Sequence, residues 1–187
     1  MLSYNSPINE SKNYSELIIT EMEPTIKINL RGKKREFITK IGKSLSIIPP
    51  TEANTSSGNE ILSILWLSPD EWMIYSNEKK NQIDDNYNLE DTLYSEISKV
   101  SLGSVVNVTD QWVMINLKGN KIYDLLSSGC PFNFNKFKNS KGAVTQTLLN
   151  HIDIIIHNKN INDVNLFVRR SFSNHLWSWM NDSSRFI

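Results

Sequence analysis

The stretch Ile28-Asn-Leu-Arg-Gly-Lys-Lys34 recurs 87 positions later as Ile115-Asn-Leu-Lys-Gly-Asn-Lys121. In each copy an apolar strand pattern ends at a glycine, and the pattern of an amphipathic helix follows. A shared motif at a shared place in the secondary structure indicates two related units. The sequence therefore predicts two pseudo-repeat halves of mixed strands and helices, at about residues 17–104 and 105–187.

Apolar periodicity predicts the elements on either side of the repeated motif. Ile28 and Leu30 alternate with polar neighbours, which is the period of a half-buried strand, whereas Phe37, Ile41 and Leu45 share one helix face. The same reasoning predicts strands at 61–67, 72–75, 105–108, 112–117, 144–149, 152–157 and 164–168, and helices at 88–100, 122–126 and 173–181. The fold class that follows is α+β, with antiparallel strand pairs covered on one face by helices.

The first residues of the chain differ from the rest. Residues 1–16 are rich in Asn and Ser and show no apolar period, so they predict a flexible N-terminal arm. Residues 17–187 are expected to form a single domain. A chain of this length buries enough surface to fold without metal or disulfide cross-links.

Composition excludes several classes of protein. The 20 basic and 20 acidic residues cancel, which removes the long-range attraction that a general nucleic-acid binder uses. The single cysteine, Cys130, cannot form an intramolecular disulfide. No stretch reaches the roughly 18 to 20 apolar residues of a membrane-spanning helix, and no signal-peptide pattern opens the chain. We therefore expect a cytoplasmic protein with no nucleic-acid or membrane partner.

The sequence contains no convincing catalytic or ligand-binding motif. The glycines are isolated and form no phosphate-binding loop. His151 and His157 would share a strand face with Asp153, but no further metal ligand lies nearby in the sequence. Burial between two tryptophans could raise the pKa of a carboxyl in Asp70-Glu71, although a turn between two strands explains this pair as well. No catalytic, cofactor-binding or metal-ligating residue is expected on this chain.

The last predicted helix carries a surplus of aromatic residues. By the helical period, Phe172, Leu176, Trp179 and Met180 form its buried stripe. Trp177 then points outward, as expected of a ring that contacts a partner.

Two arginines precede this helix. Arg169 and Arg170 alternate across a strand end, so one of them should seek a carboxylate, either within the chain or on another protein. Trp177, Arg169 and Arg170 are therefore candidate residues of a partner interface.

Five motifs in order resemble the gamma subunit of heterotetrameric sarcosine oxidase. They are WLSPDEWMI (66–74), NVTDQWVMINLKG (107–119), SSGCPFNF (127–134), TQTLL (145–149) and VRRSFSNHLWSWM (168–180). The resemblance covers about residues 17–182. It implies that residues 17–187 form a gamma-subunit domain of two ferredoxin-like halves with antiparallel sheets, similar to the folate-binding domain of aminomethyltransferases.

The resemblance also implies a function. The complex would demethylate sarcosine oxidatively to glycine, with formation of 5,10-methylenetetrahydrofolate and hydrogen peroxide. FAD, FMN, NAD, tetrahydrofolate and zinc would belong to the alpha, beta and delta subunits, and none to this chain. Two hypotheses follow. The chain is a noncatalytic structural subunit of that complex, or it is a stand-alone folate-binding or aminomethyltransferase-like protein.

Overall fold

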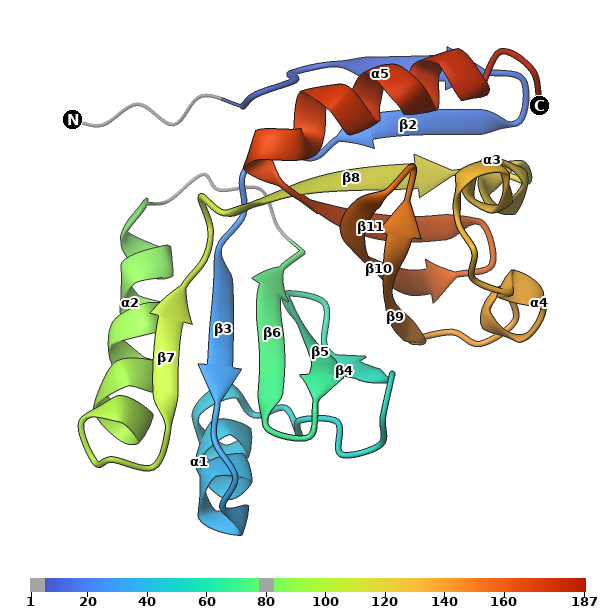
Figure 1. Cartoon of the computed structure of the whole chain (residues 1–187). Helices are drawn as coiled ribbons and strands as arrows, with labels where there is room; N and C mark the ends of the chain where they lie inside the picture. The colour runs from blue at the N-terminus through green and yellow to red at the C-terminus, as the bar shows by residue number, and fades with distance from the viewer. Residues whose placement is uncertain (1–5, 78–82) are drawn as a thin grey trace. The chain divides into compact units, whose positions relative to one another are not determined.

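The computed structural model describes residues 6–77 and 83–187, with the backbone alone for residues 83–87. Its contacts divide the chain into two compact units (Figure 1). Unit 1 comprises Met1–Pro24 and Asp110–Ile187, and unit 2 comprises Thr25–Thr109. Each unit contains one antiparallel sheet with helices, so the expected α+β class is confirmed.

Unit 2 contains a five-stranded sheet in the order β4-β5-β6-β3-β7 (Figure 1). Its elements are β3 (Lys27–Arg31), α1 (Arg35–Leu45), β4 (Ser56–Gly58), β5 (Leu62–Ser68), β6 (Glu71–Ser76), α2 (Ile83–Leu93), the π-helical turn η1 (Tyr94–Ser98) and β7 (Ser104–Asn107). Without the short edge strand β4, the chain order is β-α-β-β-α-β with the first strand between the third and the fourth. This is the ferredoxin-like arrangement.

The core of unit 2 lies between its sheet and its helices. Ile28 and Leu30 point from β3 toward Phe37 and Ile41 of α1, and all four side chains are buried. The Phe37 ring lies 5.7 Å from the Trp72 ring of β6. The apolar spacing that predicted a strand followed by a helix therefore also specifies how the two pack.

Unit 1 contains a six-stranded sheet in the order β1-β2-β8-β11-β10-β9. Its elements are β1 (Ser11–Tyr14), β2 (Leu17–Glu21), β8 (Trp112–Lys118), α3 (Ile122–Gly129), the short α4 (Phe134–Phe137), β9 (Val144–Leu149), β10 (Ile152–Asn160), β11 (Asp163–Arg169), the 3₁₀ turn η2 (Arg170–Phe172) and α5 (Ser173–Ser183). β8, α3, β10, β11 and α5 follow one another as β3, α1, β5, β6 and α2 do. The second half is thus ferredoxin-like too, as expected.

The fourth strand of unit 1 comes from the other end of the sequence. β2 pairs with β8 through Ile19 and Leu117 and takes the place that β7 has beside β3. Residues 17–24, expected in the first half, therefore belong with the second. The division between halves lies at Thr109 and Asp110 instead of 104 and 105, because β7 closes the sheet of unit 2.

The N-terminal segment is ordered from residue 6, so the expectation of a flexible arm is wrong for residues 6–16. β1 pairs with β2, with Ser11 opposite Thr20. The buried carboxylate of Glu21 accepts hydrogen bonds from the backbone N–H groups of Ile8 and Asn9. A short polar strand can be held in this way without an apolar period of its own. Residues 1–5 lie outside the described residues.

Candidate functional site

Helix α5 buries a different stripe from the expected one. Ser173, Leu176, Trp177 and Met180 are its buried residues, at the spacing i, i+3, i+4 and i+7. Only 6% of the Trp177 surface is exposed, so the prediction that this ring lies on the outside is wrong. The small Ser173 begins the stripe, and the sequence pattern assigned that place to Phe172 instead.

The N-terminal strand helps to hold Trp177 in place. The indole Nε1–H donates to Glu10 Oε2 at 3.3 Å, and Lys12 Nζ lies 3.1 Å from the same carboxylate oxygen. The Lys12 hydrogen bond, followed by that of Trp177, lowers the pKa of the Glu10 carboxyl. Glu10 lies in the segment that was expected to be flexible. Its carboxylate thus provides the hydrogen-bond acceptor for the indole N–H of a core tryptophan.

Arg169 lies at the end of β11, directly opposite Trp112 of β8 in the strand register. Its side chain is exposed, and its guanidinium carbon is 4.9 Å from the centroid of the Trp112 ring. This geometry is a cation–π contact, which keeps the planar guanidinium against the indole. Arg169 therefore lies at the surface with its guanidinium over the Trp112 ring.

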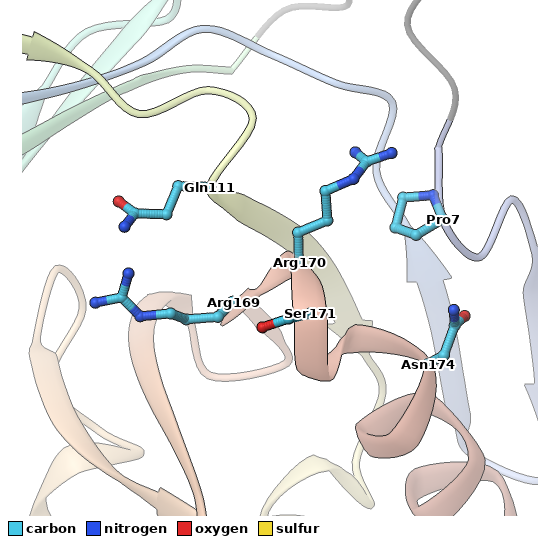
Figure 2. A pocket seen from close by; sticks show the side chains of 6 residues that line it. All are labelled: Pro7, Gln111, Arg169, Arg170, Ser171 and Asn174. Atoms are coloured by element: carbon cyan, nitrogen blue, oxygen red, sulfur yellow. The ribbon is translucent and has the colours of Figure 1, made fainter.

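Arg170 begins the turn η2 and is half-buried. Its backbone N–H donates to Gln111 O at 2.9 Å, and its carbonyl accepts from Ser173 Oγ at 2.8 Å. These two bonds fix the backbone between β11 and α5. The two arginine side chains leave the turn on different sides, Arg169 toward Gln111 and Arg170 toward Pro7 (Figure 2).

A shallow hollow of about 660 Å³ surrounds these arginines (Figure 2). Its lining residues are Pro7, Gln111, Arg169, Arg170, Ser171 and Asn174. The sequence pattern identified the two arginines but missed Gln111, Trp112 and Pro7. Gln111 and Trp112 come close to the arginines through the register of β8 against β11, and Pro7 does so through the path of the N-terminal segment. Neither long-range arrangement can be read from a local sequence pattern.

The structure separates His151 from His157. His151 lies with Asn150 in a tight turn where both residues have positive φ. Contrary to the expectation, His151 therefore does not share a strand face with His157. His157 is buried, and burial lowers its pKa to about 4. No group of three or more His, Cys, Asp or Glu side chains capable of holding a metal occurs in residues 6–77 and 88–187.

Asp70 and Glu71, the acidic pair between Trp66 and Trp72, lie at the turn that connects β5 to β6. A hydrogen bond from Ser68 is the main cause that lowers the pKa of Asp70, which is opposite to the increase that burial would give. Glu71 accepts from Asn29 at 2.6 Å and pairs with Arg31 at 3.2 Å. These contacts support the turn interpretation of the pair.

The comparisons with known proteins agree with this fold. Residues 35–185 match the family model of the sarcosine oxidase, gamma subunit family. Among curated protein sequences, none matches the chain. No helix in the described part of the chain has the length and hydropathy needed to cross a bilayer.

Solved structures of two known proteins are among those that are similar to the chain. One is a chain of heterotetrameric sarcosine oxidase from Corynebacterium sp. U-96, with a TM-score of 0.80 and 19% identity, covering 90% of this chain and 84% of that one. The other is the glycine cleavage system aminomethyltransferase T from Bartonella henselae, with a TM-score of 0.64 and 13% identity. Here the match covers 89% of this chain but only 45% of that one. At these identities the two likenesses establish the shared fold.

Proposed function

The chain belongs to the sarcosine oxidase gamma subunit family, and we propose that it is a noncatalytic structural subunit of a cytoplasmic heterotetrameric sarcosine oxidase. The observation that carries the proposal is the family match over residues 35–185, most of the chain. The fold shared with a chain of the Corynebacterium enzyme supports it, because the similarity extends over 84% of that chain.

In this role the chain assembles with alpha, beta and delta subunits. The complex demethylates sarcosine to glycine and forms 5,10-methylenetetrahydrofolate and hydrogen peroxide. FAD, FMN, NAD, tetrahydrofolate and zinc are carried by the partner subunits. Three polar contacts within this chain support the assignment of the cofactors to the partner subunits, because the side chains involved stabilise the fold of this chain. Glu71 pairs with Arg31, Asp163 accepts from Asn116, and Glu21 holds the N-terminal segment.

Co-expression tests the proposal. The tagged chain is produced with the alpha, beta and delta subunits from the same organism, and the purified material is analysed for stoichiometry, flavin content and sarcosine-dependent oxygen uptake. We expect all four chains in equal amounts and an active complex. The same expression without this chain should give an unstable or incomplete assembly. A stable and active sarcosine oxidase formed without it would overturn the proposal.

One observation favours a second candidate, a stand-alone folate-binding protein. The fold is shared with aminomethyltransferase T over 89% of this chain. Titration of the isolated chain with tetrahydrofolate in a calorimeter separates the two functions. Binding at micromolar concentrations would favour the second candidate, whereas no heat of binding at millimolar ligand would leave the structural subunit as the better account.

A further inference from the structure

Ile48 is an apolar side chain that a fixed backbone holds in solvent. It is 81% exposed, and no large apolar side chain in the described part of unit 2 is more exposed. It follows Ile47, which is buried in the core, and the next two residues are buried prolines. The Ile48 carbonyl accepts a hydrogen bond from Ser57 Oγ at 2.6 Å, and the Pro50 carbonyl accepts one from Trp72 Nε1 at 2.8 Å. The exposure of Ile48 therefore belongs to a well-anchored loop.

A second exposed isoleucine follows the edge strand β4. Ile61 is 50% exposed and lies in the turn between β4 and β5. Asn59 Oδ1 accepts hydrogen bonds from the N–H groups of Ile61 and Leu62, at 2.9 and 2.8 Å. The Ile61 carbonyl accepts from the N–H of Asn77 at 2.7 Å, and Leu62 packs against the core of unit 2. The loop before β4 and the turn after it thus each hold an isoleucine in solvent.

The charge beside these isoleucines has one sign. Residues 44–77 contain acidic residues but no lysine, arginine or histidine. Two of the acidic residues pair with basic residues outside this stretch. The other two, Glu52 and Glu60, are exposed and form no ion pair with a described residue. An apolar centre with a charged border is the usual composition of a protein interface.

This charge selects between the partners that an apolar surface could have. A second copy bound through the same surface would bring the glutamates of both copies together, and residues 44–77 supply no cation to compensate them. Anionic lipid headgroups and nucleic-acid phosphates would be repelled in the same way. A protein surface with basic residues around an apolar recess would instead gain both apolar burial and charge pairing.

We propose that Ile48, Ile61, Glu52 and Glu60, together the β4 surface, bind another subunit of the complex at an apolar recess bordered by lysine or arginine. The isoleucines supply the buried centre of the contact, and the glutamates supply a rim that favours the correct encounter. Because the backbone is fixed before binding, little conformational entropy is lost on docking. This inference rests on the proposed function, since it requires the other subunits as partners.

The test measures how well variants of the full chain compete with the wild type for a place in the complex. Each variant is co-expressed with the wild-type chain and the alpha, beta and delta subunits, and the complex is purified through a tag on the alpha subunit. Mass spectrometry gives the ratio of variant to wild type in the complex, relative to that in the whole extract. Circular dichroism and thermal unfolding of each purified variant confirm that it folds.

Two double variants alter the β4 surface, and each has a control of the same chemistry elsewhere. The altered pairs are Ile48→Ser/Ile61→Ser and Glu52→Lys/Glu60→Lys. The controls are Val100→Ser/Ile161→Ser, at side chains that are each 52% exposed, and Asp91→Lys/Asp153→Lys, at exposed acidic residues. We expect the relative ratio to fall roughly ten- to hundredfold for the isoleucine pair and roughly three- to tenfold for the glutamate pair, with both controls near one.

Incorporation of the folded isoleucine variant at the wild-type level would overturn this inference alone. An equal loss in the matched controls would do so too, because the effect would then not belong to the β4 surface. Two measurements on the isolated chain address the other occupants, sedimentation for self-association and co-sedimentation with vesicles that contain phosphatidylserine. Either kind of association, if abolished by Ile48→Ser/Ile61→Ser, would also overturn the inference. Failure of the wild-type chain to enter the complex would instead overturn the proposed function.

Discussion

Asn29 and Asn116 occupy the same place in the two units and make the same hydrogen bond. Asn29 Nδ2 donates to Glu71 Oε1 at 2.6 Å, and Asn116 Nδ2 donates to Asp163 Oδ1 at 2.7 Å. In each unit the acceptor is the first residue of the neighbouring antiparallel strand, β6 or β11. The repeated asparagine therefore links β3 to the start of β6 in unit 2 and β8 to the start of β11 in unit 1.

Replacing these asparagines should have unequal effects. Asn116 is buried and also donates to Asn165 Oδ1 at 2.8 Å, so we expect Asn116→Ala to lower the free energy of unfolding by about 1–3 kcal/mol. Asn29→Ala should cost less, about 1 kcal/mol, because Glu71 keeps its ion pair with Arg31.

Urea unfolding followed by circular dichroism measures both changes. The control is Asn135→Ala, an exposed position where we expect a change within about 0.5 kcal/mol. Equal and negligible costs at Asn29 and Asn116 would show that the shared bond does not stabilise either half.

The glycine of the second motif should not tolerate a side chain. Gly119 has φ +124°, and a Cβ there would collide with the carbonyl oxygen of Glu16. We expect Gly119→Ala to lower the free energy of unfolding by about 2 kcal/mol or more. Gly42 lies inside α1, where a Cβ would meet its nearest atom only at 3.7 Å. Gly42→Ala should raise the free energy of unfolding by about 0.5–1 kcal/mol.

Thermal unfolding of the two alanine variants checks this pair. The melting temperature should fall for Gly119→Ala and rise for Gly42→Ala. A loss of stability at Gly42 equal to that at Gly119 would contradict the steric explanation, since only one of the two sites lacks room.

Local patterns predicted most elements because each strand and helix packs through its own apolar period. β3, α1, β8 and α3 all lie close to the ranges expected from the repeat. The features of the fold that the sequence does not predict depend on pairing between strands that are far apart in the chain. The edge of β8 is filled by β2, which lies about a hundred residues away in the chain.

The same limit applies to the candidate site. The sequence indicates that one of Arg169 and Arg170 contacts a carboxylate, within the chain or on another protein, because a charged pair at a strand end is visible locally. Trp112 became part of the site only through the β8–β11 register. Lys27 shows a further limit. It is buried, with its Nζ donating to Thr25 O at 3.0 Å, although alternation alone would direct it to solvent.

His157 should make stability depend on pH below neutrality. Its pKa is about 4 in the folded chain, against about 6.5 when unfolded. Between these pH values the unfolded chain binds a proton that the folded chain does not, so the stabilisation is complete above pH 6.5 and declines as the pH falls toward 4. The shift corresponds to a stabilisation on the order of 3 kcal/mol.

Urea unfolding at several pH values tests this expectation. His157→Gln should remove this component and give a shallower decline between pH 6.5 and 4, whereas the exposed His175→Gln should keep the wild-type slope. If both variants retain that slope, another group is responsible for the pH dependence.

Trp177 and Phe172 give the sharpest test of how α5 is oriented. The sequence pattern predicts a buried Phe172 and an exposed Trp177, whereas the structure has Trp177 buried and Phe172 exposed. The indole of Trp177 is buried in the core of unit 1, so Trp177→Ala should lower the free energy of unfolding by about 3–5 kcal/mol. Trp177→Phe keeps most of the packing and loses the bond to Glu10, so its cost should be nearer 1 kcal/mol. Phe172 is half exposed, and Phe172→Ala should change the stability of the isolated chain by only about 0.5 kcal/mol. Urea unfolding of the three variants measures these differences. If Phe172→Ala costs more than Trp177→Ala, α5 is rotated relative to this structure and the outward Trp177 of the sequence prediction is restored.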